Sequence, residues 1–167
     1  MKPLLNYFVD LCLLRVGPQD LPSSGVLLVL TFLLNVLVGL VMIADARSGL
    51  MMALAESLFE SVLMLTVLYA ALQARNRPAR FTQAATALMG SGLLLGLFAW
   101  PLVAWSNRSE SAEAGLLLLI LLIWSIVVLA HILRHTFEIS KNLGLGAALF
   151  YTLLSWNLTF MLFPVTD

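Results

Sequence analysis

The segment "MMALAESLFESVLMLTVLYAALQ", residues 51–73, decides the fold expected of this chain. It is apolar over about the 20 residues that a helix needs to cross a membrane. Glu56 and Glu60 nevertheless stand in it one helical turn apart, each followed by a serine. An acid at the centre of a span raises the free energy of membrane insertion by about 3 kcal/mol. All the Leu, Val and Phe side chains of this segment together lower it by roughly 4 kcal/mol. The segment therefore needs neighbouring helices, water or protonation to accommodate its acidic face.

The rest of the chain has the same apolar character. Of its 167 residues, 61% are hydrophobic and 11% are charged, whereas a soluble domain has about 25% charged residues. The net charge is zero, which gives no electrostatic reason to expect nucleic acid as a partner. We therefore expect an all-α membrane bundle over residues 1–167, with no separate soluble domain. The five expected spans cover about residues 24–44, 51–73, 82–105, 114–134 and 143–163.

The N-terminal segment, residues 1–23, is expected to lie at the membrane interface as an amphipathic helix. Lys2, Asn6 and Asp10 recur every four residues and form a narrow polar stripe on an otherwise apolar helix. An extension of the first span is the alternative. Two prolines in "GPQDLPSS", residues 17–24, make that alternative unfavourable because proline interrupts a helix.

The basic residues between the spans predict the orientation of the chain. Seven fall on the side of the N-terminus and two on the other side. Because Lys and Arg accumulate in cytoplasmic loops, we expect a cytoplasmic N-terminus and an external C-terminus. Arg75, Arg77 and Arg80 form the densest basic loop. A role in orienting the chain is enough to explain the basic residues of this loop. The alternative is that they contact anionic lipids or a cytoplasmic partner.

The two acids have a limited choice of partners at their expected depth. In this orientation Glu56 lies below the outer boundary and Glu60 lies near the midplane. Asn35 in the first span and Asn157 in the fifth match that depth. We therefore predict an intramembrane polar site made of Glu56, Glu60, Asn35 and Asn157. A fifth residue, Arg47, is close enough in sequence to reach down to Glu56.

Two interpretations of this polar site follow from general principles. An ionisable residue within a membrane commonly marks a site for a proton, a cation or a polar head group. Alternatively, protonated acids form hydrogen bonds between helices and only fix their packing. The sequence leaves both interpretations open.

Two further patterns have weaker functional meaning. His131, His135 and Glu138 would share one face of a continuing helix, and a His pair at this spacing can bind zinc. No fourth ligand is evident, and Cys12 is the single cysteine, so we expect neither a metal nor another cofactor. Gly92 and Gly96 allow close helix approach, either within the bundle or in a dimer.

The order of these parts resembles the small bacterial members of the Yip family of membrane proteins. The resemblance rests on a short N-terminal amphipathic stretch and a proline-containing connection, "LLRVGPQDLPSS" (residues 13–24), followed by about five spans. It covers most of the chain. It implies a five-helix, non-catalytic protein of the bacterial inner membrane, and it assigns no functional residue.

These observations predict a non-enzymatic inner-membrane protein that works as an oligomer or as a subunit or scaffold of a membrane complex. No set of nucleophile and base is evident, which argues against an enzyme. The expected partners are membrane lipids, further copies of the chain or other membrane subunits. The alternative is a small transporter or channel in which Glu56 and Glu60 handle a proton or a cation.

Overall fold

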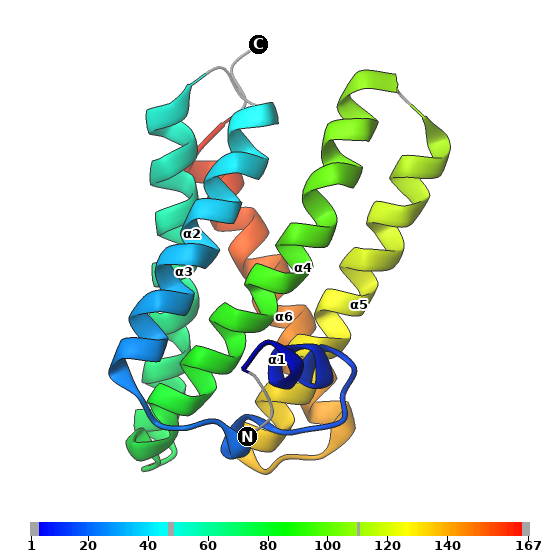
Figure 1. Cartoon of the computed structure of the whole chain (residues 1–167). Coiled ribbons are helices and arrows are strands. Elements are labelled where there is room, and N and C mark those ends of the chain that lie inside the picture. Colours follow the sequence, from blue (N-terminus) through cyan, green and yellow to red (C-terminus); the bar gives the residue numbers. More distant parts are fainter. Residues whose placement is uncertain (1–3, 47–48, 110, 165–167) are drawn as a thin grey trace.

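The computed structural model describes residues 4–46, 49–109 and 111–164 of the chain. These residues form helices joined by short turns and contain no strand (Figure 1), which confirms the all-α expectation. In chain order the elements are α1 (Leu4–Cys12), the short 3-10 helix η1 (Pro18–Asp20), α2 (Gly25–Ala46), α3 (Leu50–Ala74), the short 3-10 helix η2 (Pro78–Arg80), α4 (Phe81–Ser109), α5 (Ala112–Phe137) and α6 (Lys141–Leu162).

The expected spans correspond to the long helices of the structure. Within the described residues, five helices, α2 to α6, are long and apolar enough to cross a membrane. Their ends differ from the expected ones by a few residues, as is common for helix ends, which fray. The structure is therefore consistent with a multi-pass membrane protein.

Helix α4 occupies the centre of the arrangement. It packs against α2 on one side and α5 on another. Helix α3 packs against α2, and helix α6 packs against α5 (Figure 1). The first half of α4 suits this position because it is rich in small residues, which let helix backbones approach closely. Ala84, Ala85, Ala87 and Gly90 are all buried there.

The hydrophobic core lies in one half of the bundle. We call the end that carries the α3–α4 loop and the α5–α6 turn the basic end, and we call the opposite end the far end. The core joins the last turns of α3, the first half of α4 and the last turns of α5, together with the N-terminal segment. Its larger buried members are Leu11, Leu21, Leu68, Leu72, Leu88, Met89, Val128, Ile132 and Leu133.

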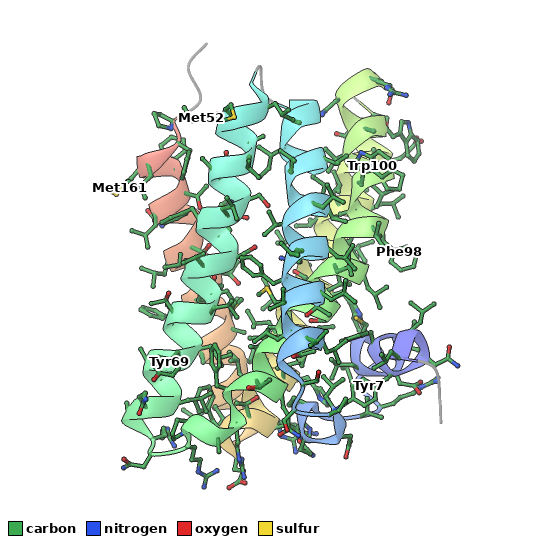
Figure 2. All side chains as sticks on the ribbon, turned by 60° about the vertical axis from the view of Figure 1, so that its left-hand side comes forward. Tyr7, Met52, Tyr69, Phe98, Trp100 and Met161 are labelled. Carbon is green, nitrogen blue, oxygen red and sulfur yellow. The ribbon has the colours of Figure 1, made fainter. Side chains whose placement is uncertain are left out.

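Large apolar side chains also cover the outside of the bundle. Figure 2 shows Phe98 and Trp100 of α4 and Met161 of α6 pointing away from the other helices. Phe98 is 68% exposed and Met161 is 76% exposed. A soluble protein rarely leaves so many large apolar groups uncovered, whereas a lipid environment solvates them.

Helix α1 packs along the side of the bundle against α4. Its Phe8 ring lies so close to Gly90 that a Cβ atom on Gly90 would overlap the ring. Gly90 stands about 14 Å along α4 from the start of that helix. Apolar residues lie on two faces of α1, because Phe8 and Leu11 are buried whereas Leu5 and Val9 are exposed. A helix is thus present in the N-terminal segment over Leu4–Cys12, whereas its amphipathic character and its position at a membrane interface stay predictions.

Hydrogen bonds hold the N-terminal segment in this place. Trp124 Nε1 donates to the carbonyl of Cys12 at 3.1 Å, and the amide of Gln83 donates to the carbonyl of Leu21 at 2.7 Å. The hydroxyl of Tyr7 donates to the carbonyl of Gly17 and closes the segment on itself. Burial, followed by the charge of Asp20, raises the pKa of Tyr7 to about 12, so the phenol keeps the proton that it donates.

Candidate functional site

Side-chain hydrogen bonds connect α2 with the acidic helix α3. Ser57 Oγ donates to the carbonyl of Val36 at 2.9 Å, and Asn35 Nδ2 donates to Ser61 Oγ at 3.3 Å. Gly39 makes this approach possible, because a Cβ atom there would overlap the hydroxyl of Ser57. The serines that follow Glu56 and Glu60 therefore form a polar contact between two helices.

A pocket of about 400 Å³ lies beside this contact, between α2, α3, α4, α5 and α6. Glu60 lines it and is an exposed residue, and Oε1 of its carboxyl group accepts a hydrogen bond from Thr159 at 3.4 Å. The other polar groups that line the pocket are hydroxyls and one amide, while methionine, leucine and tryptophan side chains complete its wall. These polar residues are Asn35, Ser57, Ser61, Tyr151, Thr152 and Ser155.

The structure brings together only part of the predicted polar site. Asn35 and Glu60 line the same pocket, whereas Glu56 is buried and does not line it. Asn157 is exposed on α6, and its Nδ2 donates to the carbonyl of Leu153 in the same helix at 3.0 Å. Arg47, which the sequence suggested as a partner of Glu56, lies outside the described residues.

The polar face that α6 turns toward Glu60 is made of residues that the predicted polar site did not include. Tyr151, Thr152, Ser155 and Thr159 recur at helical spacing and therefore lie on one face. Asn157 follows Ser155 by two residues, which places it on roughly the opposite face. The spacing of these polar residues, rather than the presence of an amide, identifies the side of α6 that faces Glu60.

The glycine pair of α4 packs inside the bundle. A Cβ atom on Gly92 would lie 2.8 Å from Asn35 Oδ1, and one on Gly96 would lie 2.8 Å from Val38 Cγ1. Both glycines thus serve the approach of α4 to α2. Of the two roles open at the level of sequence, the structure shows packing within the bundle.

A second charged constellation lies at the basic end. Glu138 forms ion pairs with Arg77 Nη1 at 2.6 Å and with Arg80 Nη2 at 2.5 Å, and Arg80 also donates to the carbonyl of Thr136 at 3.0 Å. Arg80, followed by Arg77, holds the pKa of Glu138 below its usual range. This arrangement, which we call the Arg–Glu clamp, connects the α3–α4 loop to the α5–α6 turn. Arg75, the third member of the basic loop, is exposed.

The clamp also separates Glu138 from the histidines with which it was grouped. Helix α5 ends at Phe137, and Glu138 adopts a left-handed conformation with φ of 54°. His131 is engaged elsewhere, because its Nε2 lies 2.9 Å from the carbonyl of Val16 and donates to it. Within the described residues, no three His, Cys, Asp or Glu side chains converge in a way that could hold a metal ion.

Cys12 behaves as a packing residue. It is buried at the end of α1, and burial raises the pKa of its thiol to about 11. A thiol with a raised pKa stays protonated and is a poor nucleophile or ligand. Comparisons of the chain with protein-family models, with curated proteins and with solved structures found no match.

Proposed function

We propose that this chain is a non-enzymatic, multi-pass protein of the bacterial inner membrane that works as a subunit of a membrane assembly. The five long apolar helices support the membrane location. The distribution of basic residues supports a cytoplasmic basic end. The architectural resemblance to small bacterial Yip proteins supports a non-catalytic role. The partners within the assembly are further copies of the chain or other membrane subunits.

The exposed amide of Asn157 carries the proposal of lateral assembly. It stands within a helix that is long enough to cross the membrane, on a face with exposed Trp156 and Phe160. Its Nδ2 bonds to its own helix, which occupies only part of the hydrogen-bonding capacity of an amide. Polar side chains between membrane helices commonly bond across the interface. A second helix against this face would complete the hydrogen bonding of Asn157.

Crosslinking of α6 in native membranes tests this proposal. In a Cys12→Ser background, single cysteines at the exposed positions Leu153 and Phe160 should crosslink to a partner, whereas one at the buried Ala148 should not. Asn157→Leu should weaken the association about threefold, as expected for one hydrogen bond within a membrane. A wild-type chain that is monomeric in native extracts, with no crosslinked partner, would refute the proposal.

The pocket around Glu60 supports a second candidate function, the handling of a proton or a cation. A carboxyl group that lines a pocket of about 400 Å³, together with hydroxyls and an amide, provides the oxygen atoms that a hard cation prefers. An intramembrane acid can equally accept and release a proton. This candidate is specific to Glu60, since Glu56 does not line the pocket.

Flux measurements in liposomes test the second candidate. The wild-type chain should dissipate a proton or potassium gradient, Glu60→Gln should abolish that flux, and Glu60→Asp should retain part of it. Glu113→Gln is the matched control because it removes a carboxyl group from the first turn of α5, away from the pocket. Absence of flux from correctly incorporated wild-type protein would remove this candidate and leave the assembly proposal untouched.

A further inference from the structure

A groove at the basic end is lined by basic side chains in one part and by aliphatic side chains in another. It has a volume of about 410 Å³ and lies between the N-terminal segment, the end of α5 and the start of α6. Basic side chains occupy one part of its lining, and aliphatic side chains occupy the rest. The basic residues are His131, Arg134 and Lys141, and the aliphatic residues are Leu14, Val127, Ala130 and Leu145.

The two kinds of residue stand at different distances from the basic end. Arg134 lies one turn before the end of α5, and Lys141 is the first residue of α6. Val127 lies about 10 Å further along α5 than Arg134. The groove therefore changes from cationic at its mouth to apolar at its deeper end, over about the length of the first half of an acyl chain.

The two cations at the mouth are available to an anion. Within the described residues, neither Arg134 nor Lys141 forms an ion pair, whereas Arg77 and Arg80 both bind Glu138. The carboxyl group of Glu138 is already engaged through both oxygens. Its negative charge is therefore largely neutralised by the clamp, and the mouth of the groove keeps a positive field.

His131 has a different part in the groove. Its Nε2 donates to the carbonyl of Val16 and thereby holds in place the segment of the chain that follows Leu14. Leu14 forms the wall of the groove on the side of the N-terminal segment. His131 thus positions this wall, while Arg134 and Lys141 remain for the ligand.

We propose that this groove binds an anionic glycerophospholipid of the membrane leaflet at the basic end. The phosphate lies between Arg134 and Lys141, and one acyl chain follows Val127, Ala130 and Leu145. A lipid fits better than free phosphate because most of the lining is aliphatic and a phosphate ion would leave it empty. The inference rests on the membrane location proposed above but requires neither assembly nor ion transport.

Native mass spectrometry of the full chain in a mild detergent tests the site. Dioleoyl phosphatidylglycerol is the anionic probe, and dioleoyl phosphatidylcholine is the zwitterionic one. The wild type should bind the anionic lipid roughly tenfold more tightly. Arg134→Gln and Lys141→Gln should each weaken its binding about fivefold, and the double variant roughly 25-fold. Arg75→Gln, which removes a charge from the same end but lies outside the groove, should change it less than about twofold.

A second variant and a competitor separate a lipid site from a phosphate site. Leu145→Trp fills the apolar part and leaves both charges in place, so it should weaken binding of the anionic lipid about tenfold. Millimolar inorganic phosphate should not displace the lipid. Circular dichroism melting establishes that each variant folds. Equal binding of the two lipids, an unaffected double variant, or displacement by phosphate together with an unaffected Leu145→Trp would each overturn the proposal.

Discussion

In the half of the bundle near the basic end, Leu72 and Ile132 are completely covered by neighbouring side chains, and α1 adds a further layer. The half near the far end is held differently. There the contact between α2 and α3 includes hydrogen bonds from Ser57 and Asn35, and an open pocket lies beside it. The first half depends on close packing, and the second depends on a few polar contacts around a space.

This difference indicates which half can change shape more easily. Close-packed interiors resist rearrangement because every displacement removes many van der Waals contacts. Single hydrogen bonds between membrane helices contribute about 0.6 kcal/mol on average, so they are exchanged at little cost. The basic half thus serves as the rigid support, and the half with Glu60 is the adaptable part.

The largest expected effect compares two isoleucines of the same helix. Ile132→Ala should lower the free energy of unfolding by about 2–3 kcal/mol because it leaves a cavity in the packed half. Ile123→Ala on α5 should change it by less than about 0.5 kcal/mol, since that side chain is 55% exposed. Unfolding of the purified chain by increasing SDS in mild detergent, followed by circular dichroism, measures both. Equal losses would contradict the burial of Ile132 in the packed core.

A second comparison concerns two glycines. Gly90→Ala should cost about 1–2 kcal/mol because the new methyl group overlaps the ring of Phe8 and forces α1 to move. Gly115→Ala on α5 meets no atom within 4 Å and should be neutral or stabilise the helix by up to about 1 kcal/mol. The same SDS titration measures both variants. A stable Gly90→Ala chain with α1 still docked would show that the packing there is looser than described.

A smaller effect tests the hydrogen bonds of the far half. Ser57→Ala should cost about 0.6 kcal/mol because it removes a bond between α2 and α3. Ser125→Ala is the matched control, because Ser125 Oγ donates to the carbonyl of Leu122 within its own helix. The control should leave the SDS midpoint nearly unchanged. If both serines behave alike, the contact between α2 and α3 does not depend on its hydroxyl.

The smallest effect concerns pH and the Arg–Glu clamp. The pKa of Glu138 is lower in the folded chain than in the unfolded one, so its contribution is present above the ordinary carboxyl range. That contribution disappears as the pH falls through the lowered pKa of the folded state. The melting temperature of the wild type should therefore fall more steeply than that of Glu138→Gln between about pH 6 and about pH 3. Parallel curves would show that the clamp adds no stability.

The helices themselves could be predicted well from the sequence. In a membrane, apolar length and polar loops determine where a span begins and ends, and the spans here are separated by short charged loops. Small residues also predicted close packing of α4, and Gly92 and Gly96 confirm it. Local composition carries both kinds of information.

Which side of each helix faces the inside of the bundle could not be predicted in the same way. The inside of the bundle and the surrounding lipid are both apolar, so Ile123 and Ile132 have opposite positions without any difference in chemistry. Asn157 was grouped with Glu60 by depth alone, yet it lies on the exposed side of α6. The clamp was missed because Glu138 leaves the helix in a left-handed conformation without the glycine that usually marks such an end.

The docking of Phe8 against Gly90 has a consequence for how the chain is made. Synthesis proceeds at about 5–20 residues per second, and Gly90 emerges about 80 residues after Phe8. Phe8 therefore waits roughly 4–16 s for its binding partner, and the carbonyl of Cys12 waits longer still for Trp124. During that interval Phe8 and Leu11 lack the helix that buries them in the folded chain. Cys12 can time the event, because its thiol becomes inaccessible to reagents when α1 docks.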